Sequence, residues 1–394
     1  METALEGLRV LDLSEIGAGP FCSMVLADLG AEVIRVSPPE RKTRPAVTGE
    51  FLGHDVYYFT LNRNKKSITL DIRRARKVFY DLAEKADVVL DNYRPGVMEK
   101  LGVDHDSLKL VNPGIVSCPI TGFGPTGPHA HRPAYDLIAA ALSGSMWLAG
   151  EGETGPLVSP FFIADIAAGM LACHGILAAL YARERTGLGQ KVDTSVLEAQ
   201  IALMFVPAAH YFITGQMPGK AGSGHGLPTA APYGTFRTRD GFVAVGGHRF
   251  FEKLCQALGR PDLLGDPRFD TPVKRRENKA QLLSLLQEIF LTRTTAQWLE
   301  ALEAGDVPCA PVNRMDEGLA DPQVLERGMV AQVDYQGTPI KGLGNPIKLS
   351  ATPPDKRGVY RSPPAIGQHT REVLSQLLGY SESKIEELEK QGAI

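Results

Sequence analysis

In the first third of the chain, apolar and polar positions alternate between the pattern of buried strands and the pattern of helices. Short apolar runs and one run of period two predict strands at 8–13, 31–36, 67–72, 86–90 and 114–119. Apolar residues at helical spacing lie between them, at 20–29 and 77–85. Strands that alternate with helices of this length predict a parallel, doubly wound α/β sheet.

The pattern changes along the rest of the chain. A long apolar helix is predicted over 166–185, and it ends at Thr186-Gly187, a pair typical of a helix C-terminus. The Gly-rich stretch 215–226 indicates a linker, and Asp240-Gly241 beyond it indicates a β-hairpin. Further helices are predicted at 250–258, 279–290, 296–304 and 372–390. The chain is therefore expected to form a smaller second domain at about 225–325.

Composition and charge narrow the class of protein. The 394 residues are 43% hydrophobic and 22% charged, which is typical of globular proteins and not of disordered chains. The formal net charge is −3, so no basic excess supports a nucleic-acid partner. No apolar run reaches the roughly 18–20 residues of a membrane span, and the N-terminus shows no secretory or transit segment. We expect a cytoplasmic protein with no nucleic-acid or membrane partner.

Cysteines and histidines give no sign of a metal centre. The cysteines are far apart and lack CxxC spacing; they are Cys22, Cys118, Cys173, Cys255 and Cys309. Buried thiols in a reducing compartment are the favoured interpretation. Four of the scattered histidines are His129, His131, His225 and His248, and their spacing does not supply a ligand set, so no metal is expected.

The first β–α turn holds Gly17-Ala18-Gly19-Pro20. A dinucleotide-binding turn has a third glycine, which lets the backbone approach a pyrophosphate. Here that glycine is missing and a proline opens the helix, so a tight turn with proline at the first helical position is favoured over NAD binding.

Segments along nearly the whole chain, in order, carry a resemblance to one family. These segments are 7–13, 18–20, 26–36, 62–71, 91–97, Tyr135-Asp136, Ser143-Gly144, Asp165 with Gly169-Met170, 186–190, 231–234, 307–312 and 367–370. From about residue 4 to the C-terminus the chain resembles the family III CoA-transferases, the group of formyl-CoA transferase, carnitine CoA-transferase and α-methylacyl-CoA racemase.

The resemblance implies an α/β architecture and an oligomeric state. It implies a large Rossmann-like CoA-binding domain at 1–205, completed by about 330–394, a linker at 206–224 and a small α+β domain at 225–325. Two such chains are expected to form an interlocked homodimer, with each active site between the large domain of one subunit and the small domain of the other.

Asp165 matches the family's catalytic aspartate. From its position just before the long helix alone, the favoured role is an N-cap, because aspartate accepts from the free N–H groups there. The two roles are compatible, since such N–H groups would hold the carboxylate ionised, as a nucleophile must be. The resemblance implies a covalent mechanism through an Asp165 anhydride and an aspartyl-CoA thioester. No ATP, metal or tightly bound cofactor is expected, and coenzyme A or acyl-CoA enters as substrate.

The resemblance also implies a set of CoA contacts. These are Ile16, Gly17, Arg35, Leu70, Ile72, Arg73, Asn92, Arg94, Val97, Lys100, Leu101 and Tyr135. The basic members suit the phosphates of CoA, although for any one of them taken alone a solvated surface side chain is the favoured interpretation. Backbone donors for the oxyanion are expected from Gly246 and Gly247 or from 222–226, where a strand-end turn and a linker remain the alternatives.

Departures from the family pattern bear on the reaction. The racemase branch has a histidine where this chain has Tyr135, and a phenol is a poor proton shuttle at neutral pH. Formyl-CoA transferase has a glutamine in place of Gly17, so a larger acid than formate or oxalate is expected here. It also has an arginine in place of Pro38, so one contact of that enzyme with the adenine of CoA is not expected in this chain. We predict a CoA-transferase acting on an acyl-CoA donor, with succinyl-CoA as the candidate, and on a carboxylic acid acceptor. The alternatives are an α-methylacyl-CoA racemase or epimerase, a CoA-binding protein without turnover and an NAD-linked oxidoreductase.

Overall fold

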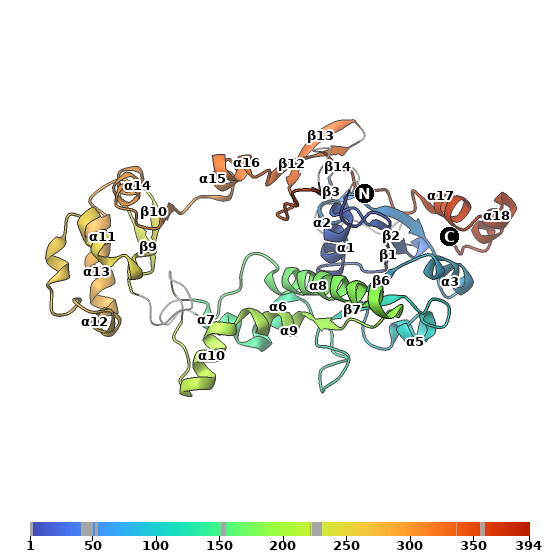
Figure 1. The fold of residues 1–394 in the computed structure, drawn as a ribbon, viewed down its shortest axis with the longest axis horizontal. Coiled ribbons are helices and arrows are strands. Elements are labelled where there is room, and N and C mark those ends of the chain that lie inside the picture. Colours follow the sequence, from blue (N-terminus) through green and yellow to red (C-terminus); the bar gives the residue numbers. More distant parts are fainter. Residues whose placement is uncertain are drawn as a thin grey trace. The chain divides into compact units, whose positions relative to one another are not determined.

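The computed structural model describes residues 3–40, 50–51, 54–150, 155–220, 222, 231–335, 337–354 and 359–394 (Figure 1). The chain divides into two compact units. The first unit consists of Met1–Ser143, Ser159–Leu203 and Pro322–Ile394, and the second of Gly144–Val158 and Met204–Asp321. Residues 144–158, which the sequence analysis placed in the large domain, therefore lie in the second unit.

A six-stranded parallel sheet forms the centre of the first unit. Its strands, in their order across the sheet, are β5 (Lys66–Thr69), β2 (Glu32–Ser37), β1 (Arg9–Asp12), β6 (Val88–Asp91), β7 (Val116–Thr121) and β8 (Thr194–Ser195). Numbered within the sheet, this order is 3-2-1-4-5-6, which is the doubly wound order. The predicted parallel α/β sheet is confirmed. The strand order reverses between β1 and β6, and ligands of such sheets bind in the crevice beyond those two strand ends.

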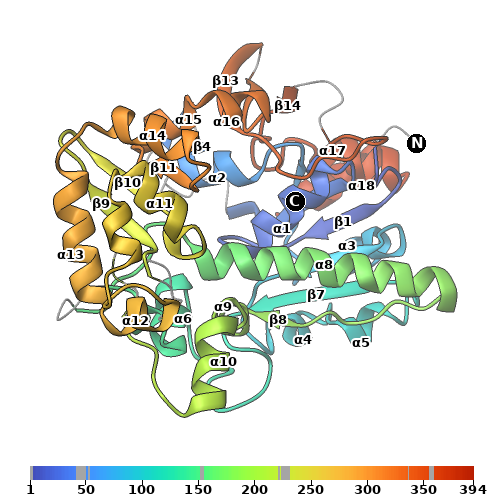
Figure 2. The same ribbon diagram turned by 60° about the vertical axis from the view of Figure 1, so that its left-hand side comes forward.

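Helices cover both faces of this sheet (Figure 2). The helices of the first unit are α1 (Ala18–Asp28), α2 (Val56–Leu61), α3 (Arg76–Glu84), α4 (Val97–Leu101), α5 (His105–Leu108), α6 (Asp136–Ser143), α8 (Ile163–Thr186), α9 (Val196–Leu203), α16 (Pro322–Glu326), α17 (Thr370–Glu372), η4 (Val373–Leu377) and α18 (Glu382–Lys390). The predicted tail helix over 372–390 is thus broken into separate helices. Short strands β3 (Glu50–Phe51) and β4 (His54–Asp55) form a small hairpin, and β13 (Thr338–Leu343), β12 (Val330–Tyr335) and β14 (Val359–Arg361) form a second sheet.

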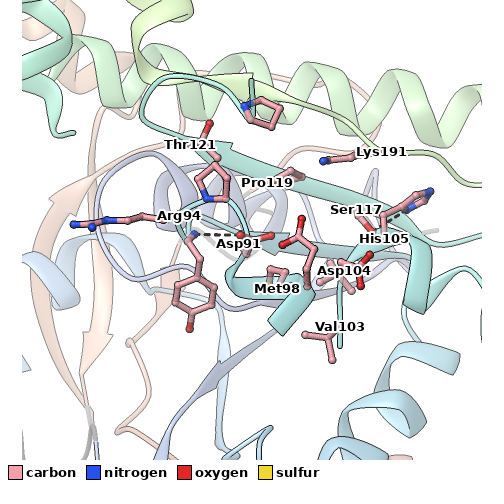
Figure 3. Close-up of a pocket in the computed structure, with 15 residues that line it drawn as sticks. Asp91, Arg94, Met98, Val103, Asp104, His105, Ser117, Pro119, Thr121 and Lys191 are labelled. Carbon is pink, nitrogen blue, oxygen red and sulfur yellow. Dashed lines mark hydrogen bonds between the residues drawn. The ribbon is translucent and has the colours of Figure 1, made fainter. Parts of the chain in front are cut away.

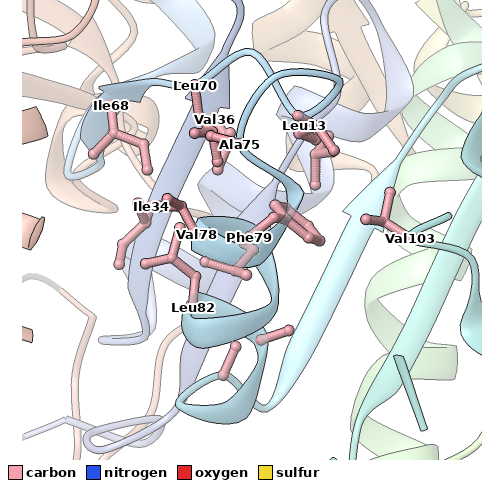
Figure 4. Packing of buried hydrophobic residues seen from close by; sticks show 14 of the residues in the cluster. Leu13, Ile34, Val36, Ile68, Leu70, Ala75, Val78, Phe79, Leu82 and Val103 are labelled. Atoms are coloured by element: carbon pink, nitrogen blue, oxygen red, sulfur yellow. The ribbon is translucent and has the colours of Figure 1, made fainter. Parts of the chain in front are cut away.

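Two apolar clusters hold the sheet between its helices. On one face α3 packs on the strands through Phe79 and Leu82, which are fully buried against Ile34 and Ile68 (Figure 4). On the other face α1 and α8 pack closely on each other and on the strands. A side chain at Gly169 of α8 would place its Cβ 2.6 Å from a carbonyl oxygen of α1, so the close crossing requires glycine there.

Helix α8 is also apolar enough, by length and composition, to cross a membrane. The prediction that no apolar run reaches this length was therefore wrong. Half of its most apolar window is buried inside the protein, and α8 packs on α1 and β7. This burial is typical of the core helix of a globular domain.

The Asn62–Lys65 segment contacts both helix α1 and the C-terminal part of the first unit. The Arg63 guanidinium contacts the buried Asp28 carboxylate at 2.6 Å, and Asn345 donates to the same carboxylate at 3.2 Å. The Asn64 side chain accepts from Arg361 N at 2.8 Å. One motif of the family resemblance thus joins helix α1, near the start of the chain, to segments near its end.

The second unit contains a three-stranded antiparallel sheet packed with helices. Its strands are β9 (Gly234–Arg237), β10 (Phe242–Val245) and β11 (Cys309–Pro311). Its helices are α7 (Ser145–Leu148), α10 (Phe205–Thr214), η2 (Gly247–Arg249), α11 (Phe251–Ala257), η3 (Pro261–Leu264), α12 (Pro272–Glu277), α13 (Lys279–Phe290), α14 (Thr295–Ala304) and α15 (Met315–Leu319). The hairpin at Asp240-Gly241 is confirmed. The first part of the predicted linker at 206–224 is the helix α10.

Candidate active site

The turn after β1 is built on a buried aspartate. Asp12, the last residue of β1, accepts from Ser14 N at 2.9 Å, from Ser23 Oγ at 2.5 Å and from Lys65 Nζ at 3.2 Å. Burial alone would raise the pKa of Asp12, but the charges of Lys65 and Arg35 outweigh it and lower that pKa. The ionised carboxylate fixes the start of the turn that leads to Gly17.

Asn92 joins this turn to the end of β6. Its side-chain amide donates to Ile16 O at 2.7 Å and accepts from Glu15 N at 3.0 Å. Two of the predicted CoA contacts, Ile16 and Asn92, are thus brought together where the strand order reverses. Ile16 is 45% exposed, so its side chain is open to a ligand at this edge of the sheet.

Gly17 brings the turn against Asp165. A Cβ built on Gly17 would lie 2.4 Å from Asp165 Oδ2, and the backbone of Gly17 has φ 73°. Only glycine adopts this conformation readily and leaves room for the carboxylate. Asp165 lies in the first turn of α8, as its third residue.

The N-cap role expected for Asp165 was wrong. The N-cap residue of α8 is Phe162, whose side chain makes no capping hydrogen bond. Instead Asp136 Oδ1, from α6, accepts from Ala164 N at 2.7 Å and from Asp165 N at 3.2 Å. The free N–H groups of α8 are therefore bonded to a different carboxylate.

The pKa of Asp165 is raised, whereas the sequence analysis expected a carboxylate that stays ionised. Burial first, and then the charge of Asp136, raise the pKa of Asp165 to about 7. The sequence analysis expected the helix N–H groups to hold this carboxylate ionised. The structure shows a half-buried carboxyl group whose charged form is destabilised, so that it exchanges a proton near neutral pH.

Tyr57 is a residue of this site that sequence reasoning missed. The phenol of Tyr57, on α2, is hydrogen-bonded with the backbone of Gly17. Burial, and next the charge of Asp165, raise the pKa of Tyr57 to about 12. Its ring packs edge-on against Phe162, at 6.1 Å between centroids. Tyr57 lies in an aromatic run that reads as core, and no local pattern connects it with a helix that begins more than a hundred residues later.

Several predicted CoA contacts lie at the surface of the first unit. Arg94, Lys100 and Tyr135 are exposed, and Val97 and Leu101 of α4 are partly buried. The Arg73 side chain is 68% exposed and is paired with Asp71. These exposed cations are accessible to the phosphates of a ligand.

Other predicted contacts are buried. Arg35 is 2% exposed beside the ring of Tyr58, and its Nε and Nη1 have no hydrogen-bond partner among the described residues. This burial speaks against the expected contact of Arg35 with a CoA phosphate. The Leu70 and Ile72 side chains belong to the apolar core, so they offer no side-chain surface to an adenine ring.

A cavity of about 60 Å³ lies on the face of β6 and β7 (Figure 3). Its walls include Asp91, His105, Ser117 and Lys191, and His105 Nδ1 lies 3.1 Å from Ser117 Oγ. Burial raises the pKa of Asp91 to about 7. Arg94 is the only predicted CoA contact among its lining residues, and Asp165 is not part of it.

The predicted oxyanion donors belong to the second unit. Gly246 N already donates to Pro308 O at 2.9 Å, so this N–H is not available to an oxyanion. Gly247 is buried at the start of η2. Of the alternative stretch 222–226, residues 223–226 lie outside the described residues, and Gly222 N donates to Gly150 O at 2.8 Å.

Comparison with known proteins gives the class of this chain. A model of the family described as CoA-transferase family III matches residues 5–370. Succinyl-CoA:glutarate CoA-transferase of Mus musculus is 36% identical over 401 residues, which cover 99% of this chain and 90% of that protein. Succinyl-CoA:mesaconate CoA-transferase of Haloarcula hispanica is 36% identical over 390 residues, with 95% and 96% covered. A CAIB/BAIF family protein from Brucella suis is 34% identical, with a TM-score of 0.81, over 96% of this chain and 100% of that chain.

The chain therefore belongs to CoA-transferase family III, and the resemblance found in the sequence is confirmed. The protein is an acyl-CoA:carboxylate CoA-transferase.

Proposed function

We propose that this enzyme moves CoA from succinyl-CoA to a second dicarboxylic acid through covalent intermediates on Asp165. The observation that carries the proposal is the position of the Asp165 carboxyl group, which is half-buried against the Gly17 turn where the strand order of the sheet reverses. Two relatives are named for succinyl-CoA together with glutarate or mesaconate, which are both dicarboxylic acids. The Asp165 carboxyl group lies where a side chain at Gly17 would be, so the size of the acyl group is proposed from these named relatives.

The reaction proceeds by exchange at acyl carbons. The Asp165 carboxylate attacks the thioester carbon, the C–S bond breaks, and CoA thiolate leaves a mixed anhydride between succinate and Asp165. The thiolate then attacks the Asp165 carbonyl carbon, which releases succinate and forms an aspartyl-CoA thioester. The acceptor carboxylate attacks the carbonyl carbon of this thioester, the C–S bond breaks, and CoA thiolate leaves a mixed anhydride between the acceptor and Asp165. The thiolate then attacks the acyl carbon of the acceptor, which forms the product acyl-CoA and releases the Asp165 carboxylate. Each step makes one acyl bond and breaks another, so the thioester energy is kept.

CoA is proposed to bind in the crevice beyond β1 and β6. The hydrogen bond from Asn92 to Ile16 O lies at these strand ends and supports this position. Arg73, Arg94 and Lys100 are exposed cations on the connections after β5 and β6, and they would pair with the phosphates of CoA.

The homodimer expected from the resemblance remains a proposal, and α10 supports it. Phe205, Phe212 and Ile213 on this short helix are 73%, 81% and 83% exposed. Large apolar side chains gathered on one exposed helix mark an interaction surface. Size-exclusion chromatography with light scattering would give twice the chain mass for the native protein. Phe212→Asp together with Ile213→Asp would lower that mass, and a monomeric native protein would contradict the proposal.

Substrate panels test the proposed reaction. The protein is incubated with succinyl-CoA or acetyl-CoA and with glutarate, mesaconate, oxalate or butyrate, and the CoA esters are separated and identified by mass spectrometry. Succinyl-CoA with a dicarboxylic acid of five carbons, glutarate or mesaconate, is expected to give the highest kcat/KM. Transfer to butyrate at an equal rate would overturn the dicarboxylate assignment, and transfer to oxalate alone would overturn the expected preference for a longer dicarboxylic acid. Exchange of the α-hydrogen for deuterium without any acid exchange would favour the racemase alternative.

A further inference from the structure

Asp136 and Asp165 share the N-terminus of α8. Asp136 is the first residue of α6 and is 7% exposed. Its Oδ1 receives the N–H groups of Ala164 and of Asp165 itself, at 2.7 and 3.2 Å. A carboxylate from 29 residues earlier in the chain thus caps the helix that carries the proposed nucleophile.

We propose that Asp136 is a positioning residue for the nucleophile. It accepts the hydrogen bonds of the first backbone N–H groups of α8, so the Asp165 carboxylate lies against the Gly17 turn with no hydrogen bond from those N–H groups. This inference rests on the proposed function, because it gives Asp136 a role through Asp165. The resemblance implies no role for Asp136.

The chemical reason is the reactivity of a carboxylate. Backbone N–H groups that bond a carboxylate stabilise its charged form and thereby lower its basicity. A carboxylate that loses those donors and lies beside a like charge is a stronger base, and a more basic oxygen attacks a thioester more readily. Asp136 supplies both conditions, because it occupies the donors and carries the charge.

The other groups that face Asp165 in the first unit fit this arrangement. Tyr57 from α2 is neutral, since its pKa is raised to about 12. Helix α1, which packs on α8, carries no basic residue in its last turn and no acidic residue in its first. Among the described residues, Asp136 is the one charged side chain that acts on the pKa of Asp165. Burial raises the pKa of Asp165 most, and the nearby charge of Asp136 raises it further.

Two substitutions of Asp136 distinguish the effect of its hydrogen bonds to α8 from the effect of its negative charge. Asp136→Asn keeps an oxygen acceptor for Ala164 N and removes the charge, whereas Asp136→Ala removes both. The acid limb of the pH profile of kcat/KM reports the ionisation of the free enzyme. Asp136→Asn is expected to move the midpoint of this limb down by about one pH unit, the order expected for loss of a nearby like charge. Its kcat in alkaline buffer is expected to fall, because a less basic carboxylate is a weaker nucleophile.

A matched control is available in the second unit. Asp240 also accepts from the first N–H of a helix that lies far along the chain, Thr295 N of α14, at 2.7 Å. Asp240→Asn is expected to leave the acid limb where it is. If Asp136→Asn does not fold, Asp136→Ser supplies a neutral cap and carries the same expectation.

The outcomes distinguish this inference from the proposed function. An active Asp165→Ala enzyme would sink the covalent mechanism, whatever Asp136 does. An inactive Asp165→Ala enzyme, together with an Asp136→Asn acid limb that coincides with the native one, would overturn only the role of Asp136. A purely structural role would lower the amount of folded enzyme at every pH and leave the midpoint unchanged.

Discussion

Gly17→Ala is the substitution that tests the geometry of the site most strictly, because the added methyl group would collide with the Asp165 carboxyl group. The new Cβ would lie 2.4 Å from Asp165 Oδ2, whereas ordinary contact begins at 3.4 Å, so the turn or the carboxylate must move by the difference of about 1 Å. A displacement of this size at a reacting group costs roughly 100-fold in rate. The positive φ of Gly17 adds about 1–3 kcal/mol of backbone strain.

Gly7→Ala separates the two effects. Gly7 also has a positive φ, of 90°, but nothing lies within 4 Å of the Cβ that alanine would add, so this substitution brings strain without a collision. Both variants are expected to lose stability in urea unfolding through this strain, and only Gly17→Ala is expected to lose about 100-fold in kcat. A Gly17→Ala enzyme with native kcat, or an equal loss of activity in Gly7→Ala, would refute the placement of Asp165 against this turn.

Three further predictions concern stability. The pKa of Asp165 lies near 7 in the folded chain and near 3.9 when unfolded, so folding is penalised increasingly as pH rises from about 4 to about 7. Asp165→Asn is therefore expected to exceed the native stability at about pH 8 by up to about 4 kcal/mol, and to match it near pH 4, in urea titrations. Lys65→Met removes the ion-pair partner of the buried Asp12 and is expected to lower the free energy of unfolding by about 3–5 kcal/mol. The double variant with Asp12→Asn is expected to regain part of this loss. An unchanged urea midpoint in Lys65→Met would contradict the pairing. Trp298→Ala empties the core of the second unit and is expected to cost about 3–5 kcal/mol in calorimetry, with little loss expected in the transition of the first unit.

The sheet could be predicted from the sequence because its signals are local. Each central strand is a short apolar run, and β1 and β6 are almost fully buried because helices cover both faces. Helix α13 was predicted with the bounds that the structure shows, since its apolar positions recur at helical spacing. The helix α10 was missed because its apolar residues surround it and none is buried in the chain itself.

The site could be predicted only in part, because its contacts join distant segments. Asp165 is at the head of a helix, as expected, but the partner of that helix end is Asp136, and sequence spacing gives no information on such a pairing. Arg35 looked like a surface cation, but its strand is central and its charge lies near the buried Asp12. A parallel sheet that is covered on both faces buries nearly every side chain of its inner strands, so a basic residue there is a poor candidate for a phosphate contact.

Trapping the covalent intermediate tests the central claim most directly. The native protein is incubated with succinyl-CoA, quenched with hydroxylamine, digested and analysed by peptide mass spectrometry. An acyl-activated aspartate would be converted to its hydroxamate, and we predict this product at Asp165, dependent on succinyl-CoA and absent from Asp165→Ala. Turnover of succinyl-CoA with no modification of the Asp165 peptide, or with the hydroxamate on another residue, would contradict the covalent mechanism at Asp165.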